Sequence, residues 1–392
     1  MANNRDAVIV SAVRTAIGRQ GGALASVPAH VFGAEAVKEA LNRAGISSEE
    51  VDDVIMGNVL SGGGNIARLT ALQTGMGDHL AGLTVDRQCG SGINAVNLAA
   101  QAIWSGDGDV YIAGGVESMS QAPYLMARPE KPFSPAPPKF RKSQLSPKEI
   151  GDPPMGITAE NLVEKYGISR EEQDDFALQS QLRTARAMEE GRFDEQIVPI
   201  TIPVRKGEPV VFDKDEHPRP QTTKEALAKL PPAFLEGGTV TAGSSSGLND
   251  AASATVLMSR EKAEELGLAP LAVIRAHAVA GVDPNIMGIG PVPATRKVLE
   301  KAGLSLEDMD IIEINEAFAA QVLACDKELK MDLEKVNVNG GAIALGHPLG
   351  ATGAILLTKA VYELKRSEGK YALITACIGG GQGIATIIER EG

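Results

Sequence analysis

A cysteine set among glycines at the predicted start of a helix is the first residue of this chain with the chemistry of a nucleophile. Cys89 lies in Arg87-Gln-Cys-Gly-Ser-Gly92, before a stretch whose apolar residues recur with helical period as far as Trp104. The free N–H groups and positive dipole end at a helix N-terminus favour a thiolate. Because most free cysteines are simply buried, this position alone leaves both interpretations open.

A histidine in a second glycine-rich segment is a candidate acid or base. His347 lies in Gly346-His-Pro-Leu-Gly-Ala-Thr-Gly353, which we interpret as a strand-to-helix turn, and Pro348 fixes the backbone after it. Imidazole exchanges protons near neutral pH, which suits general acid–base chemistry. The other histidines lack such surroundings and are predicted to be structural: His30, His79, His217 and His277.

Two further polar candidates stand at the ends of predicted strands. Cys377 closes an apolar run and opens a glycine turn whose N–H groups can bind an oxyanion or a phosphate, so its thiol suits a base or a second nucleophile. Asn315 follows the apolar run 311–314, and active sites of α/β sheets gather at strand ends. A helix cap explains Asn315 equally well. Cys325 has apolar neighbours in a helical run and is predicted to lie in the core.

The elements that must position these residues repeat along the chain. Ala44-Gly-Ile-Ser-Ser-Glu-Glu-Val-Asp52 returns as Ala302-Gly-Leu-Ser-Leu-Glu-Asp-Met-Asp310, each leading from a helix that ends at glycine into a strand-like run. Helix–strand–glycine patterns that begin near Gly92 and Gly353 lie at nearly the same offset. We predict two halves of like topology in a layered α/β fold. Chance similarity of two common turns is the alternative.

The segment between residues 118 and 249 differs in texture, with clustered prolines and denser charge. A helix is predicted from Arg170 to Glu190, capped by Ser169. We interpret the segment as an insertion, which in α/β proteins often covers the active site. The predicted division is an N-terminal half over 1–268, with the insertion at 118–249, and a C-terminal half over 269–392.

Composition excludes several classes of protein. The 392 residues, 43% hydrophobic and 22% charged, predict two or three domains with large cores rather than a disordered chain. A net charge of −12 argues against nucleic-acid binding, and no apolar run approaches the ~20 residues of a membrane span. Three cysteines without a CxxC pair argue for a reducing compartment. The N-terminus leads directly into a strand-like run, so we expect no targeting peptide and a cytoplasmic location.

Seven segments, occurring in one order over nearly the whole chain, resemble the motifs of the thiolase family. They are Asp86-Arg-Gln-Cys-Gly-Ser-Gly92, Gly114-Gly-Val-Glu-Ser-Met-Ser120, Met155-Gly-Ile-Thr-Ala-Glu-Asn161, Thr241-Ala-Gly-Ser-Ser-Ser-Gly-Leu-Asn-Asp250, Asn315-Glu-Ala-Phe318, Gly346-His-Pro-Leu-Gly-Ala-Thr-Gly353 and Cys377-Ile-Gly-Gly-Gly381. The resemblance implies a five-layer αβαβα fold of two similar halves. It also implies that the insertion is an α/β-loop domain that binds coenzyme A.

The resemblance implies a role for each candidate. Cys89 would be the nucleophile that an acyl-CoA acylates, and His347 would take its proton and later help to hold the thioester oxygen of the second substrate. Cys377 would move the proton at the α-carbon of acetyl-CoA. Asn315 would position a water that helps to hold the enolate. The N–H groups of Cys89 and Gly379 would form a second oxyanion site, and the kinetics would be ping-pong.

The coenzyme A contacts are implied in the same way. Arg219 would meet the nucleotide end and Ser246 the pantetheine, with Ala242 and Leu248 in the same motif as Ser246. Residues 204–235 hold six Lys or Arg against five Asp or Glu, slightly positive in an acidic chain, although a solvated loop would look the same. The expected partners are CoA and acyl-CoA as substrates, with no permanently bound cofactor and no metal.

The motifs disagree about acyl-chain length. Pro154 stands where many biosynthetic acetoacetyl-CoA thiolases have histidine, which resembles the degradative branch of fatty acid metabolism. The Cys-Gly-Ser-Gly at the nucleophile points the other way, and Met155 and Met287 match positions that line the acyl pocket of short-chain enzymes. We expect an acyl-CoA C-acyltransferase acting on acetoacetyl-CoA. A longer-chain 3-ketoacyl-CoA thiolase of β-oxidation is the alternative.

Two other classes of protein share parts of this pattern. Condensing enzymes of the ketoacyl-synthase kind have a similar doubled fold but usually lack a second cysteine like Cys377. A non-catalytic acyl-CoA or lipid-binding relative would need none of the four reactive side chains. Thiolases are commonly dimers or tetramers, so we expect a homo-oligomer such as a homotetramer.

Overall fold

The structure is a computed structural model that describes residues 4–61, 63–129, 131, 137–204 and 206–391. Its strands are β1 (Ala7–Thr15), β2 (Gly18–Arg19), β3 (Asp53–Gly57), β4 (Leu83–Val85), β5 (Val110–Ser118), β6 (Ile197–Val198), β7 (Ile200–Ile202), β8 (Val210–Phe212), β9 (Asn249–Ser259), β10 (Ala272–Gly281), β11 (Ile311–Ile314), β12 (Tyr371–Ile378) and β13 (Gln382–Arg390). Its α-helices are α1 (Ala29–Ala44), α2 (Ile66–Gln73), α3 (Ser91–Ser105), α4 (Met155–Tyr166), α5 (Arg170–Glu189), α6 (Lys224–Ala228), α7 (Arg260–Glu265), α8 (Pro291–Ala302), α9 (Ala319–Leu329), α10 (Ala342–Leu345) and α11 (Leu349–Ser367).

The two halves have the same strand order. The first half reads β3-β5-β9-β1 and the second β11-β12-β13-β10, and β1 joins β10 as an antiparallel pair with Val8 opposite Val273. In each half the first two strands are parallel and the other neighbours are antiparallel. The repeated motif explains part of this match, because Gly45 and Gly303 end α1 and α8 with φ of 67° and 65°, a conformation that glycine adopts without strain.

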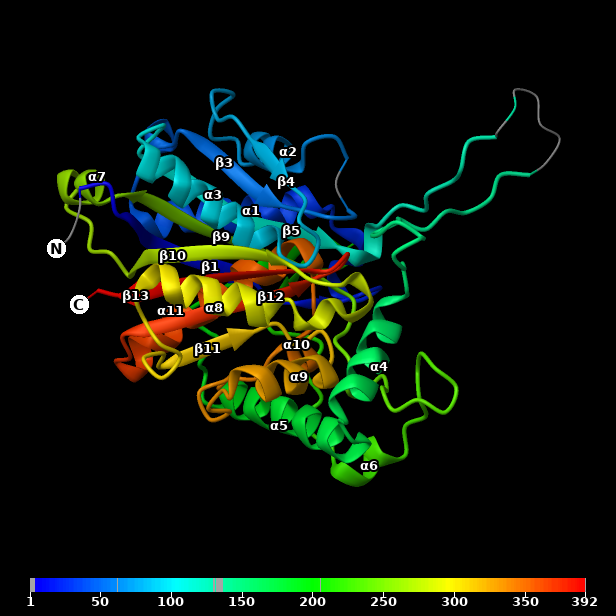
Figure 1. Cartoon of the computed structure of the whole chain (residues 1–392). Coiled ribbons are helices and arrows are strands. Elements are labelled where there is room, and N and C mark those ends of the chain that lie inside the picture. Colours follow the sequence, from blue (N-terminus) through cyan, green and yellow to red (C-terminus); the bar gives the residue numbers. More distant parts are fainter. Residues whose placement is uncertain (1–3, 62, 130, 132–136, 205, 392) are drawn as a thin grey trace.

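Helices lie on both sides of each half and between the halves. Helices α1 and α2 pack on the outer face of the first half, and α8 and α9 on the outer face of the second (Figure 1). Helices α3 and α11 lie side by side between the two halves, and both are buried on nearly all sides. A helix between two layers must be largely apolar, and its buried polar groups need partners, as Lys359 of α11 finds in Glu313 at 2.7 Å. The predicted five-layer αβαβα architecture is confirmed.

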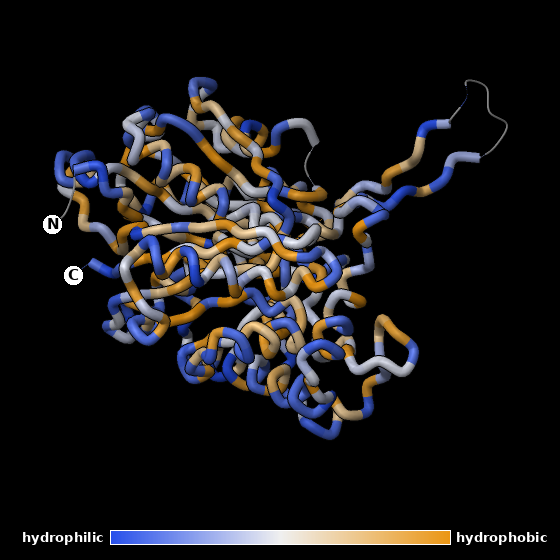
Figure 2. Tube along the Cα trace, in the orientation of Figure 1, coloured by the Kyte–Doolittle hydropathy of each residue, from blue (hydrophilic) through white to orange (hydrophobic). Residues whose placement is uncertain are grey.

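Hydrophobic residues follow the strands and the facing sides of the helices, and charged residues follow the outer turns (Figure 2). The buried apolar side chains form three large clusters, one on each side of the central helices and one around them. No helix in the described part of the chain is long and apolar enough to cross a membrane.

The segment between β5 and β9 contains an extended arm and a helical part. The arm projects from the body in Figure 1, and Ala127 N–H donates to the carbonyl of Lys139 across its two strands. Helices α4 and α5 pack on α9, and α5 begins at a capping box formed by Ser169 and Glu172, as predicted from Ser169. The residue limits predicted for the halves and the insertion stay predictions.

Candidate active site

The two candidate catalytic segments begin the two helices at the centre of the molecule. Cys89 precedes α3, His347 precedes α11, and the first turns of these helices meet backbone to backbone. A Cβ on Gly92 would lie 2.7 Å from the carbonyl oxygen of Gly350, closer than real side chains approach. We call this contact and its neighbours the glycine crossing; it comprises Gly57, Gly92, Gly115 and Gly350. These glycines therefore let two helices start side by side.

Cys89 stands on a tight turn against the end of β12. Gln88, just before it, has φ of 47°, a left-handed conformation that is uncommon outside glycine, and a Cβ on Gly90 would lie 2.7 Å from Ile378. Cys89 is partly exposed. Burial raises its pKa to about 11, although hydrogen bonds from the N–H groups of Gly379 and of Cys89 itself act in the opposite direction. Desolvation therefore opposes the thiolate that the helix start favours.

His347 is held by its backbone and by one ring nitrogen. Its N–H donates to Asn249 Oδ1 at 3.0 Å, and Nδ1 lies 2.7 Å from Thr352 Oγ1. The side chain is buried, and burial lowers its pKa to about 4. Nε2 has no hydrogen-bond partner among the residues described, so a neutral imidazole with a free nitrogen results. The turn before it follows α10 rather than a strand, which corrects the predicted strand-to-helix turn.

Cys377 and Asn315 lie on neighbouring strands, as predicted. Asn315 N–H donates to the carbonyl of Thr375 at 3.0 Å, and neither side-chain atom of Asn315 has a partner in the described part of the protein. It is not a helix cap, because α9 begins only after Phe318. Burial, and then the neighbouring Cys89, hold the pKa of the Cys377 thiol well above its ordinary value. The structure thus brings the two thiols together.

An apolar pocket surrounds Cys377. The side chains packed with it come from α4, α9 and the intervening loops: Ala159, Val240, Met287, Ala317, Phe318 and Ala320, with Met155 alongside. Met155 also approaches Gly379, where a Cβ would lie 3.6 Å from its sulfur. Both methionines predicted to line an acyl pocket therefore flank the second thiol. Cys325 is fully buried, as predicted, and its thiol donates to the carbonyl of Gly288.

A cavity of about 800 Å³ lies on the insertion side of these residues. Its lining includes Arg219, Ala242 and Ser246, three of the four residues expected to contact coenzyme A. Leu248 is not part of that lining and instead pairs with His347 in an isolated β-bridge. The serine segment also reaches the second half, because Ser246 N–H donates to the carbonyl of Ala317 at 3.0 Å. The cavity is thereby tied to the strand end that carries the asparagine.

His217, which was predicted to be structural, also faces this cavity. Its ring packs directly on Gly247: a Cβ on Gly247 would lie 2.3 Å from the ring atom Cε1. Burial lowers its pKa to about 4, with Arg219 and Arg19 adding to the effect. Neither a motif nor a period marks this histidine in the sequence, since it belongs to the site only through folding of the insertion.

Glu117, near the end of β5, accepts a hydrogen bond from Gly350 of the glycine crossing. It is fully buried and accepts hydrogen bonds from N–H or O–H groups of the following residues: Asn58, Val59, Leu60, Ser61 and Gly350. The bond from Gly350 fixes the first turn of α11, three residues after His347. A buried carboxylate surrounded by donors is stable and orients the groups that bond to it. The match of this residue to a family motif was visible in the sequence, but its position was not.

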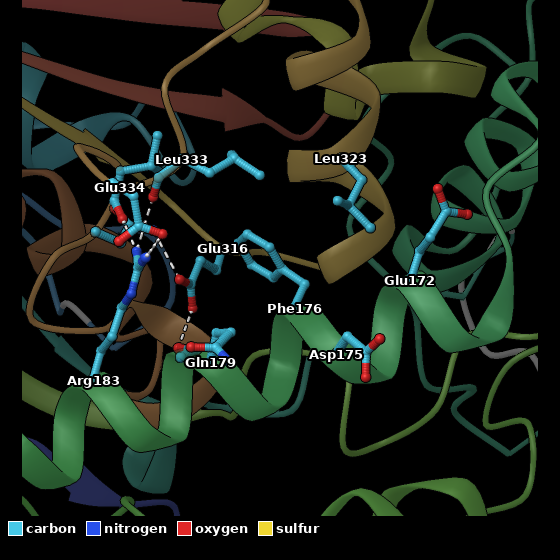
Figure 3. Close-up of a pocket in the computed structure, with 12 residues that line it drawn as sticks. Glu172, Asp175, Phe176, Gln179, Arg183, Glu316, Leu323, Leu333 and Glu334 are labelled. Carbon is cyan, nitrogen blue, oxygen red and sulfur yellow. Dashed lines mark hydrogen bonds and ion pairs between the residues drawn. The ribbon is translucent and has the colours of Figure 1, made fainter.

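A separate cavity of about 330 Å³ lies between α5, α9 and residues 333–337 (Figure 3). It contains none of the predicted site residues, but it reaches Glu316, the residue after Asn315. Ser180 and Asn337 donate to the Glu316 carboxylate at 2.7 and 2.8 Å. These bonds anchor the turn that presents the asparagine, so the cavity borders a supporting element rather than the reactive groups. Among the described residues, no His, Cys, Asp or Glu cluster suits a metal ion.

Known proteins resemble this chain over its whole length. The family model of the thiolase N-terminal domain matches residues 7–261, and that of the thiolase C-terminal domain matches residues 268–390. An acetyl-CoA acetyltransferase of Pseudomonas aeruginosa is 51% identical over 99% of this chain and 100% of its own.

Two solved structures have the same fold. The acetyl-CoA acetyltransferase of Bacillus anthracis superposes with a TM-score of 0.95 at 49% identity, covering 98% of this chain and 99% of its own. Human mitochondrial 3-ketoacyl-CoA thiolase in complex with CoA gives a TM-score of 0.93 at 45% identity, covering 100% and 99%. The order of the motifs, the doubled fold and these matches agree, and the chain belongs to the thiolase family.

Proposed function

We propose that this protein is an acyl-CoA C-acyltransferase that joins acetyl-CoA to an acyl-CoA, or cleaves a 3-ketoacyl-CoA with CoA, through an acyl-enzyme on Cys89. The observation that carries the proposal is that Cys89 and His347 precede two helices whose first turns are in contact, with Cys377 near Cys89 and Asn315 on the adjoining strand end. A binding protein would need none of these reactive groups.

The first half-reaction begins from a neutral pair. With the pKa of Cys89 near 11 and that of His347 near 4, a thiol and an imidazole are the stable forms at neutral pH. Proton transfer to the imidazole must therefore accompany attack of the sulfur on the thioester carbon. The N–H groups of Gly379 and Cys89 already point at the sulfur, so they are close to where the oxyanion forms.

The second half-reaction needs a base for a weakly acidic carbon. Cys377 fits, because a buried thiolate in an apolar pocket is a strong base once formed. Asn315 has a free amide beside it, suited to holding a water that donates to the enolate oxygen, and His347 can be the other donor only when Nε2 carries a proton. The four side chains then serve both halves of a ping-pong cycle.

Coenzyme A enters through the 800 Å³ cavity. Arg219 supplies positive charge for the nucleotide end, while Ser246 and Ala242 line the path to the reactive centre and Leu248 lies beside His347. The human relative named above was solved in complex with CoA. CoA and acyl-CoA act as substrates, and we expect no permanently bound cofactor.

We expect acetoacetyl-CoA to be the preferred substrate. Met155, Met287 and Phe318 belong to the apolar cluster that contains Cys377, and such bulky neighbours suit a short acyl group. Relatives named acetyl-CoA acetyltransferase support this assignment. A relative named 3-ketoacyl-CoA thiolase supports the alternative, a substrate with a longer acyl chain.

The proposal is tested by mixing the purified protein with acetoacetyl-CoA and CoA and measuring acetyl-CoA. The native protein should form two acetyl-CoA per cleavage, and mass spectrometry should find the acetyl group on Cys89. Cys325→Ala, a buried cysteine outside the site, serves as the matched control and should stay active. Failure to turn over acetoacetyl-CoA or any longer 3-ketoacyl-CoA would contradict the proposal.

The protein is also proposed to act as a homo-oligomer in the cytoplasm. The arm after β5 exposes Tyr124, Met126 and Phe140, with 88%, 63% and 75% of their surfaces accessible. Apolar side chains so exposed favour a second copy of the chain as partner. All three cysteines are free thiols, which suits a reducing compartment.

A further inference from the structure

The hydroxyl group of Thr352 is the only hydrogen-bond partner of the His347 ring among the described residues. Thr352 is the fourth residue of α11 and is 3% exposed, and its Oγ1 lies 2.7 Å from Nδ1. The same oxygen donates to the carbonyl of Pro348 at 3.1 Å. A threonine hydroxyl has a single proton, so once that proton is given to Pro348 only lone pairs face the imidazole. With this donation to Pro348, the hydrogen atom between Thr352 Oγ1 and the ring is assigned to Nδ1.

This hydrogen-bond arrangement decides which ring nitrogen is the base. With a proton on Nδ1, the neutral imidazole carries its free electron pair on Nε2. Nε2 is buried and has no partner within the described residues. The bond from His347 N–H to Asn249 fixes the backbone but does not distinguish the two ring nitrogens.

We propose that Thr352 is a positioning residue that holds His347 as the Nδ1–H tautomer, ready to accept a proton at Nε2. The proposal rests on the proposed role of Cys89 as nucleophile. As the Cys89 sulfur bonds to the thioester carbon, its proton moves to Nε2, and the carbonyl electron pair moves onto the oxygen. The oxygen pair then returns, the bond from carbon to the coenzyme A sulfur breaks, and that sulfur leaves with the proton from Nε2.

A hydroxyl partner differs from a carboxylate in one chemical respect. A carboxylate at Nδ1 would stabilise the protonated ring and favour a thiolate–imidazolium pair at rest. Thr352 brings no charge, and burial accounts for the low pKa of His347. The charged groups that act on Cys89, Glu117 and Asp86, are both acidic and raise the pKa of its thiol further. The resting site therefore keeps its nucleophile protonated until an acyl-CoA arrives.

The first test separates the hydroxyl from the space it fills. Thr352→Val keeps the shape and loses the hydrogen bond, so kcat/KM for acetoacetyl-CoA thiolysis should fall roughly 10- to 100-fold. Thr352→Ser keeps the hydroxyl and should recover most of the activity. Thr358→Val, a buried hydroxyl of the same helix that contacts Ser253, controls for stability and should stay near native activity. Equal losses in the Val and Ser variants would overturn the proposal.

The second test does not depend on thiolase turnover. Thr352→Asp places a carboxylate at Nδ1, so alkylation of Cys89 by iodoacetamide at pH 7 should become at least about tenfold faster than in the native protein, and its pH profile should move to lower pH. Thr352→Val should not accelerate alkylation. A folded Thr352→Asp protein with the native alkylation profile would show that this position does not act through His347. If that variant does not fold, the Val and Ser pair decides.

Discussion

At the residue scale, the site works with groups that are unreactive in isolation. Cys89 is a thiol whose pKa is raised to about 11, and His347 is an imidazole whose pKa is lowered to about 4. Both shifts have the same main cause, loss of water around the charged form. In such a site, substrate binding drives the formation of charge, and the charge forms only where the oxyanion donors can stabilise it.

Removing Cys89 and removing Cys377 should each abolish a different step of the reaction. Cys89→Ala should abolish covalent labelling by radiolabelled acetyl-CoA, because the acyl group has no sulfur to join. Cys377→Ala should still be labelled but should lose exchange of the α-protons of acetyl-CoA by at least about 100-fold, the scale of a lost general base. Measuring labelling and deuterium exchange on both variants tests the division of roles. Native exchange in Cys377→Ala would exclude this thiol as the base.

The acyl pocket offers a second residue-scale prediction. Met287→Ala removes side-chain volume beside Cys377, so the ratio of kcat/KM for 3-ketohexanoyl-CoA to that for acetoacetyl-CoA should rise roughly tenfold. Met309→Ala, which empties a buried site in the outer cluster of the second half, should destabilise without changing the ratio. A chain-length series on the three proteins supplies the measurement. An unchanged ratio in Met287→Ala would remove Met287 from the acyl pocket.

At the element scale, the glycine crossing sets where the nucleophile and the base begin. The carbonyl of Gly350 lies against Gly57, Gly92 and Gly115, and Glu117 bonds to the Gly350 N–H from the other side. The crossing is made of backbone, so it is as rigid as the two helices themselves. Side chains then need to supply only the last few bonds, such as that from Thr352.

A single methyl group should disrupt this arrangement. In Gly115→Ala the new Cβ would lie 2.0 Å from the Gly350 carbonyl oxygen, and backbone cannot yield as a side chain does. We expect a loss of about 1–3 kcal/mol in the free energy of unfolding and a larger relative loss of activity. Gly63→Ala, where a Cβ meets nothing within 4 Å, should be close to native. Urea unfolding and thiolysis assays would measure both, and equal behaviour of the two variants would contradict the role of the crossing.

Much of this could be predicted from the sequence, and the failures have physical reasons. The internal repeat predicted two like halves because Gly45 and Gly303 end equivalent helices. The raised pKa of Cys89 could not be predicted, because desolvation depends on what packs around a helix end, which periodicity does not report. His217 joins the cavity only when the insertion folds back on the body, a contact that no local pattern encodes.

At the scale of the whole molecule, buried histidines make stability depend on pH. Burial lowers the pKa values of His217, His277 and His347 to about 4, below the ordinary 6.5. Between these values the unfolded chain binds a proton at each position and the native protein does not, so these groups withdraw stability as the pH falls from about 6.5 to about 4. Buried acids with raised pKa, such as Glu316, act in the opposite direction.

One variant isolates the histidine contribution. His277 stacks on Trp104, 5.6 Å between ring centroids, and accepts from Gln101, away from the active site. His277→Gln should leave thiolysis unchanged. Relative to this variant, the native protein should lose stability in urea unfolding as the pH is lowered from 7 to 4. A difference between the two proteins that stays constant over this range would show that His277 is not buried neutral.

The arm gives a prediction about assembly. The rings of Tyr124 and Phe140 lie tilted against each other, with centroids 5.5 Å apart, and remain open to water in the single chain. Replacing both by serine should lower the mass of the particle in light scattering, because a partner chain would lose apolar contact area. Active-site labelling of Cys89 serves as the control for folding. A native protein that is already monomeric would contradict the assembly.

The bond between Gly350 and Glu117 has a consequence for hydrogen exchange. Amides in the first turn of a helix normally have no acceptor within the helix and exchange quickly with solvent deuterium. The amide of Gly350 donates instead to the fully buried carboxylate of Glu117 in β5, so it can exchange only when the start of α11 opens away from that strand. Its exchange rate would therefore report how often the segment that carries His347 leaves its place in the native protein.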